Sequence, residues 1–248
     1  MKKALLFFQL CLLTLVSCSR DTISDVNNST PQLEQSVYGC DPINTPQKWA
    51  KLNTMEEMLA ACRLSEENLK EVSTNELIDL CMKHPLAFTI TAHNNEMNGA
   101  KVIFDSFNGF AELKQRTDAA QSVIEYYKNI SLNGDDSRAG GNDMSSPIAL
   151  GFVELYLASD QLPELYSPKY LPELKKVVTE KYAEKENFPQ RYMMFSLRKS
   201  YLLQATIMIN ENSLSASDKS EAMEFVNSGG KFSSENQFNH IKSILKLK

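Results

Sequence analysis

The sequence has few of the residues on which common catalytic sites are built. It contains three histidines, five cysteines and one tryptophan in 248 residues. It has no glycine-rich phosphate loop, no Gly-x-Ser-x-Gly elbow, no His-Glu-x-x-His and no Cys-x-x-Cys. The sequence therefore predicts no cofactor and identifies no catalytic residue.

Basic charge is also scarce, because 31 acidic side chains outnumber 26 lysines and arginines and leave a net charge of −5. A nucleic-acid-binding domain needs a basic surface to neutralise phosphates, so we expect no nucleic-acid partner. Nine glycines and nine prolines exclude a collagen-like repeat. The hydrophobic content of 42% is typical of a globular protein with one large domain or two small ones.

The N-terminus predicts a secretory signal peptide over residues 1–17. Lys2 and Lys3 form a positive region, and the mostly apolar residues 4–16 follow it. Thirteen helical residues span about 20 Å, which is shorter than the roughly 30 Å hydrocarbon core of a bilayer. We therefore expect a cleaved signal and not a permanent membrane helix.

The segment Leu15-Val16-Ser17-Cys18 resembles the lipobox of bacterial lipoproteins, in which the cysteine thiol is acylated. The resemblance implies that Cys18 carries diacylglycerol and palmitate and begins the mature chain. Each buried CH₂ contributes about 0.8 kcal/mol, so several acyl chains would hold the protein at a membrane. The alternative is an ordinary signal that ends in cysteine. Ser19, where aspartate would favour inner-membrane retention, favours the outer membrane, facing the periplasm or the cell surface.

Removal of residues 1–17 takes away two lysines and no acid, so 24 basic side chains face 31 acidic ones. Anionic headgroups would repel this charge, so the lipid and not a polybasic patch would hold the protein at the membrane. Residues 18–46 contain few large apolar side chains and predict a flexible tether. Within it, Asp21-Thr22-Ile23 is similar to the O-glycosylation acceptor of Bacteroides-type secreted proteins, which makes Thr22 a candidate for modification.

Residues 47–248 predict an all-α body. Apolar residues recur at helical spacing, and Thr54 with Glu57 and Ser73 with Glu76 form capping boxes before two of the stripes. We expect antiparallel helical hairpins, with a short irregular α-solenoid as the more specific form. Glycines and acids in 132–146 predict a loop between two halves, 47–131 and 147–248. Whether the halves share one core is left open.

Few side chains in the body suggest a site. Cys62 and Cys81 lie on the apolar stripes of neighbouring helices, so they form either a disulfide in an oxidising envelope or two buried thiols. His93 and Glu96 are three residues apart and would share a helix face, a weak candidate metal pair that lacks a third ligand. His84 precedes Pro85, where its imidazole could bond the last carbonyls of a helix.

Aromatic residues are concentrated in 152–195. Flat rings can stack on sugars or form a protein-binding patch, but the same residues would also fill a helical core, which we favour. They are Phe152, Tyr156, Tyr166, Tyr170, Tyr182, Phe188, Tyr192 and Phe195.

Two segments carry a family resemblance. They are Val72-Ser-Thr-Asn-Glu-Leu-Ile-Asp-Leu-Cys-Met-Lys-His-Pro-Leu86 and Phe107-Asn-Gly-Phe-Ala-Glu-Leu113. Together they resemble a group of uncharacterised Bacteroides-type lipoproteins. The resemblance implies an envelope location and a helical body, and it transfers no active-site residue.

These features favour a lipid-anchored, non-enzymatic binding or interaction module whose protein or glycan partner is unknown. One alternative is an envelope hydrolase with a carboxylate site that includes His93 and Glu96. The other is an accessory glycan-binding subunit of an uptake complex, which would use the aromatic residues of 152–195. An enzyme should show a pocket on which carboxylates converge, whereas a binding module should expose an apolar patch.

Overall fold

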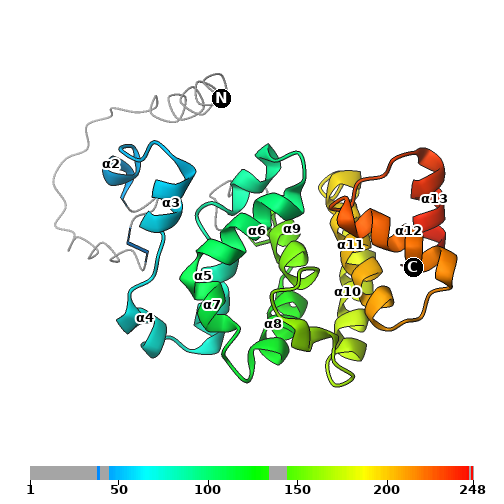
Figure 1. Ribbon diagram of the computed structural model, residues 1–248, viewed down its shortest axis with the longest axis horizontal. Coiled ribbons are helices and arrows are strands. Elements are labelled where there is room, and N and C mark those ends of the chain that lie inside the picture. The colour runs from blue at the N-terminus through cyan, green and yellow to red at the C-terminus, as the bar shows by residue number, and fades with distance from the viewer. Residues whose placement is uncertain (1–37, 40–44, 134–143, 246, 248) are drawn as a thin grey trace. The chain divides into compact units, whose positions relative to one another are not determined.

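The computed structural model describes residues 38–39, 45–133, 144–245 and 247 (Figure 1). Within these ranges every regular element is a helix, which confirms the all-α prediction. The N-terminal half contains α2 (Pro46–Trp49), α3 (Met55–Ala61), α4 (Glu66–Glu71), α5 (Thr74–Met82), the 3₁₀ helix η1 (Ala87–Ala92), α6 (Glu96–Ser106), α7 (Asn108–Leu113) and α8 (Ala119–Asn129). The C-terminal half contains α9 (Pro147–Leu157), the 3₁₀ helix η2 (Pro163–Tyr166), α10 (Leu171–Glu186), α11 (Met194–Asn210), α12 (Ala216–Asn227) and α13 (Glu235–Leu245).

Both predicted capping boxes are formed. At α3 the Thr54 hydroxyl accepts the N–H of Glu57 at 3.1 Å, and the Glu57 carboxylate accepts the N–H of Thr54 at 3.1 Å. At α5 the same exchange joins Ser73 and Glu76. These bonds satisfy backbone donors that the first turn of a helix leaves without partners, so the two helices begin where the sequence predicts.

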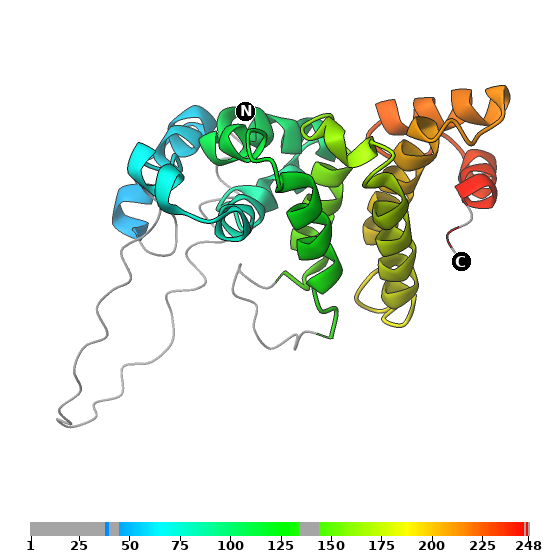
Figure 2. The ribbon, with the colours of Figure 1, turned by 90° about the horizontal axis from the view of Figure 1, so that it is seen from below.

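Side-chain contacts show how neighbouring helices run. Thr74 bonds Asp118 at the start of α5 and α8, and Asp79 bonds Tyr126 one to two turns later, so these helices run parallel. By contrast, α10 and α11 form an antiparallel hairpin and lie side by side in both views (Figures 1 and 2). Lys175 pairs with Glu211 near the open end of this hairpin.

The second half contains a parallel pair as well. Arg191, just before α11, donates to Ser145 just before α9, and Ser200 of α11 donates to Glu154 of α9. From the first contact to the second, both segments advance by nine residues towards their C-termini, so α9 and α11 run in the same direction.

In the part of the chain that the structure describes, no helix is long and apolar enough to cross a membrane.

The two predicted halves contribute to one hydrophobic core. The described residues form a single compact unit, and their buried apolar side chains make one cluster that extends from Trp49 to Leu247. Phe104 and Phe110 from the first half contact Phe152 and Tyr156 from the second, with ring centroids 5.0–6.3 Å apart. Edge-to-face and tilted contacts of this kind stabilise a core beyond the area that the rings bury.

Candidate functional site

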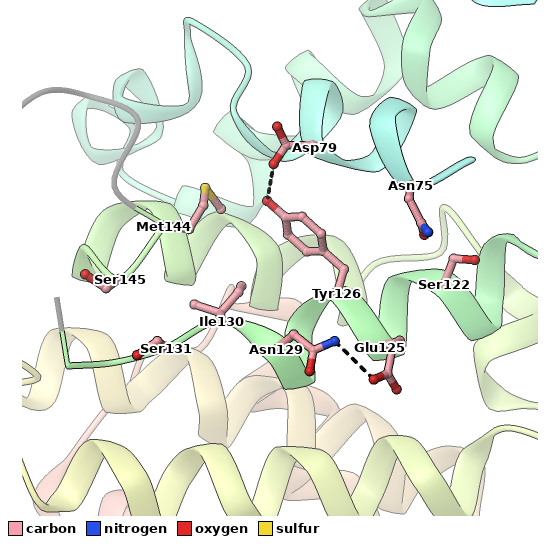
Figure 3. Close-up of a pocket in the computed structure, with 10 residues that line it drawn as sticks. All are labelled: Asn75, Asp79, Ser122, Glu125, Tyr126, Asn129, Ile130, Ser131, Met144 and Ser145. Atoms are coloured by element: carbon pink, nitrogen blue, oxygen red, sulfur yellow. Dashed lines mark hydrogen bonds between the residues drawn. The ribbon is translucent and has the colours of Figure 1, made fainter. Parts of the chain in front are cut away.

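An open cavity of about 460 Å³ lies beside α5 and α8 (Figure 3). This volume falls within the range of about 300–1,000 Å³ that is common for small-molecule sites. Most of the side chains that line it are polar. They are Asn75 and Asp79 from α5, Ser122, Glu125, Tyr126 and Asn129 from α8, Ile130 and Ser131 just after α8, and Met144 and Ser145 before α9.

Helical spacing brings these side chains to one place. Asn75 and Asp79 are four residues apart on α5, and Ser122, Tyr126 and Asn129 follow at similar intervals on α8. Residues three and four apart share a helix face, so each helix presents a polar stripe opposite its apolar one. α5 and α8 pack against each other, and the two polar stripes border the same cavity. The stripes were present in the sequence, but their juxtaposition was not.

Tyr126 occupies the centre of the lining (Figure 3). Its hydroxyl donates to Asp79 Oδ1 at 3.2 Å, and Asp79 also forms a 2.8 Å ion pair with Lys83. Burial, together with the charge of Asp79, raises the pKa of Tyr126 well above its usual value, so the phenol stays neutral. Glu125 accepts the side-chain amide of Asn129 at 3.0 Å. Both carboxylates of the cavity therefore have hydrogen-bond donors.

A buried charge network lies in the adjoining core. Glu154 and Lys185 are fully buried, and Lys185 Nζ lies 2.8 and 2.7 Å from the two carboxylate oxygens. The Ser200 hydroxyl donates to Glu154 at 2.8 Å and accepts from Lys185 at 3.0 Å, and Tyr127 donates to Glu154 at 2.7 Å. Four consecutive α-helices, α8 to α11, thus meet at one carboxylate.

Electrostatics explain why each charge of this network has a partner within it. Burial lowers the pKa of Lys185, and the adjacent Glu154 opposes that shift by favouring the ammonium ion. A buried charge without its partner would be strongly destabilising, so each member depends on the others. Sequence reasoning missed this network. Its one signal was Glu154, the only charged residue within the apolar sequence of α9.

A second ion pair corrects the prediction for His93 and Glu96. His93 does not lie on α6, because it caps the end of η1 and α6 begins at Glu96. The Glu96 carboxylate instead contacts Lys199 at 2.8 Å and Arg198 at 3.8 Å. The expected shared helix face is therefore wrong. Among the described residues no group of three or more histidine, cysteine, aspartate or glutamate side chains is placed to hold a metal ion.

Lys199 also supports an exposed aromatic ring. Its ammonium lies 3.6 Å from the ring centroid of Phe195, and the Arg198 guanidinium lies 5.5 Å from the same ring. Lys199 reaches this position by crossing α9 at Gly151, where an added Cβ would lie 2.5 Å from Lys199 Cδ. Cation–π contacts of this kind restrain the position of the Phe195 ring.

Phe195 belongs to a run of three exposed apolar residues, which we call the Met-Met-Phe segment. Met193, Met194 and Phe195 are 65%, 47% and 42% exposed. The other aromatic residues of 152–195 are buried or half-buried, which confirms the expected core role for them. Phe195 is the exception, and no periodicity in the sequence distinguished it.

Of the two alternatives for Cys62 and Cys81, the structure shows buried cysteines with no disulfide between them. Cys62 and Cys81 are both buried, but Cys81 is a free thiol and carries no bond to Cys62. The reason is geometric: α5 directs Cys81 towards Gly109 of α7, whereas Cys62 caps the end of α3. Burial raises the pKa of the Cys81 thiol, which keeps it protonated and unreactive.

His84 also differs from expectation. It is buried beside the Phe107 ring, and its Nδ1 accepts the N–H of Leu86 at 3.2 Å. Among the described residues the imidazole bonds no helix carbonyl. Burial lowers the pKa of His84 to about 3. Cys18 and Thr22, with most of the predicted tether, lie outside the described residues.

A comparison of the chain with protein-family models, curated proteins and solved structures finds no match.

Replacement of Lys185 by Met should lower the free energy of unfolding by about 3–5 kcal/mol, because Glu154 is left charged and buried. The double variant Glu154→Leu/Lys185→Met removes both charges, so it should be less destabilised than Lys185→Met alone. Urea denaturation measures the free energy of unfolding of Lys185→Met, of Glu154→Leu and of the double variant. If the double variant loses the sum of the losses in the two single variants, the pair is not energetically coupled.

The buried His84 should make the protein sensitive to acid. Its pKa in the folded state is about 3, below the usual value of about 6.5 in the unfolded chain, so unfolding takes up a proton between these pH values. The stability contribution is fully present above pH 6.5 and is lost as the pH falls. His84→Asn keeps an acceptor and does not titrate, so its stability should fall less steeply between pH 6.5 and 4. Parallel pH profiles for the two proteins would contradict this assignment.

Proposed function

We propose that the chain is a lipid-anchored protein of a bacterial cell envelope and acts as a non-enzymatic binding module. The resemblance of Leu15–Cys18 to a lipobox supports the anchor, and the polar composition of residues 18–46 supports a tether between lipid and body. The helical body then supplies the binding surface. The outer membrane is the proposed location, since Ser19 follows the candidate lipidated cysteine.

The observation that carries the binding role is the exposed Met-Met-Phe segment. Consecutive exposed apolar side chains are unfavourable in water, and such patches mark interaction surfaces. Methionine adapts to irregular apolar partners, and an aromatic ring supplies a rigid anchor. Lys199 and Arg198 already hold Phe195, so association would lose less side-chain entropy than with a mobile ring. The partner that fits this surface is a protein with an apolar pocket.

The parallel pairs α5/α8 and α9/α11, with the α10/α11 hairpin, support a short α-solenoid as the scaffold. Stacked helix pairs contact chiefly their neighbours and present extended surfaces for partners. This arrangement would display the Met-Met-Phe segment from a rigid framework.

The anchor is tested by Cys18→Ala. Without a thiol to acylate, the protein should move from the detergent phase to the aqueous phase in Triton X-114 partitioning. The control is Cys11→Ala, which alters a cysteine inside the proposed signal peptide and should leave partitioning unchanged. Equal detergent partitioning of Cys18→Ala and the natural sequence would contradict the anchor.

The binding surface is tested by Met193→Ser and Phe195→Ser in the full chain, produced in its native envelope. Partners are captured by in-cell chemical cross-linking and quantified by mass spectrometry. A partner held at this surface should lose about 2 kcal/mol of binding free energy, or roughly thirtyfold in affinity, in Phe195→Ser. Met223→Ser, at another exposed methionine on α12, is the matched control. A partner profile that is the same in all three variants would overturn the proposed surface.

A further inference from the structure

We propose that the cavity beside α5 and α8 binds a neutral, polyhydroxylated ligand, that is, a carbohydrate. This inference goes beyond the role of the Met-Met-Phe segment and concerns different residues. The proposed carbohydrate site does not include the aromatic residues of 152–195, most of which are buried in the core.

Hydrogen-bonding groups of the lining provide the first argument. The side chains of Asn75 and Ser122 border the cavity and make no hydrogen bond to another described residue. An amide and a hydroxyl each offer both a donor and an acceptor. Sugar hydroxyl groups do the same, so a carbohydrate can satisfy these side chains where an apolar ligand would leave them without partners.

Charge provides the second argument. Among the described residues that line the cavity, Asp79 and Glu125 are the charged ones and none is a lysine or arginine, so an anionic ligand would find no cationic partner in this lining. A cationic ligand is not required either, because Asp79 already pairs with Lys83 at 2.8 Å and Glu125 with Lys128 at 3.6 Å. Carboxylates that are held in this way can accept ligand hydroxyls, and the site favours a neutral molecule.

The Tyr126 ring provides the third argument. It lies at the centre of the lining residues, with its hydroxyl directed at Asp79 (Figure 3). This bond leaves the ring in a defined orientation before a ligand arrives. The C–H face of a sugar ring is apolar and can pack on such an aromatic surface, while its hydroxyls reach the surrounding polar groups.

The wall opposite α5 is held rigidly. Lys181 donates to the carbonyl of Ile130, Tyr192 donates to the carbonyl of Ser145, and Arg191 donates to Ser145 Oγ at 2.7 Å. These bonds tie the cavity rim to α10 and to the start of α11. A site formed before binding loses less free energy to ordering, so weak individual contacts can sum to measurable affinity.

The experiment uses the full chain in detergent and a panel of neutral oligosaccharides, namely maltohexaose, cellohexaose, xylohexaose, mannohexaose and laminarihexaose. Polygalacturonate oligomers serve as the anionic comparison. Binding is measured by calorimetry and by saturation-transfer NMR. We expect at least one neutral oligosaccharide to bind and the anionic oligomers not to bind.

Variants then locate the site. Tyr126→Ala should raise the dissociation constant about tenfold or more, whereas Tyr126→Phe, which keeps the ring, should stay within about threefold. Asn75→Ala and Ser122→Ala should each weaken binding severalfold. Phe88→Ala, at an exposed aromatic residue on η1, is the matched control. Phe195→Ser should leave sugar affinity unchanged, which separates this site from the proposed protein-binding surface.

Three outcomes would overturn the proposal: no binding of any neutral oligosaccharide in the panel, preference for the anionic oligomers, or sugar binding that Tyr126→Ala leaves intact. Thermal unfolding of each variant identifies any loss that arises from misfolding. Asn75→Ala and Ser122→Ala remove only polar groups of an exposed and a half-buried side chain, so they keep the test decisive if Tyr126→Ala unfolds.

Discussion

The ion pair between Glu154 and Lys185 is the interaction on which the rest of the structure depends. Both charges lie in the core, and neither is stable there without the other and without the hydroxyls of Tyr127 and Ser200. A shift of one helix by a single turn would leave a buried charge without a partner. The network therefore restrains the register of α8, α9, α10 and α11 more strictly than interchangeable apolar contacts could.

This restraint extends to both proposed binding surfaces through residues adjacent in sequence. Tyr127 enters the network, and its neighbour Tyr126 faces the cavity. Ser200 enters the network, and its neighbour Lys199 lies beneath Phe195 of the Met-Met-Phe segment. Because successive helical residues point about 100° apart, one buried cluster can position side chains on different surfaces. A change at the network should thus disturb both surfaces together.

The two surfaces suit different ligands, and this supports a binding role over a hydrolytic one. The cavity is polar, and its described carboxylates, Asp79 and Glu125, already pair with Lys83 and Lys128, whereas the Met-Met-Phe segment is apolar and exposed. Glu96, which was considered as a catalytic or metal-binding carboxylate, is neutralised by Lys199. In the proposed function a lipidated tether would hold both surfaces near the envelope, where a glycan and a protein partner could be bound by one molecule.

The sequence by itself determined the helical class, the capped starts of α3 and α5, and the apolar stripes, because these depend on residues three or four positions apart. It also indicated that most aromatic residues of 152–195 are in the core. Only the tertiary structure decided that Lys185 is buried with Glu154 and that Glu96 forms an ion pair with Lys199. It also decided that Cys81 is not bonded to Cys62 and that two polar stripes border one cavity. Periodicity specifies which face of a helix is apolar, but which helix lies against that face depends on packing between residues distant in the chain.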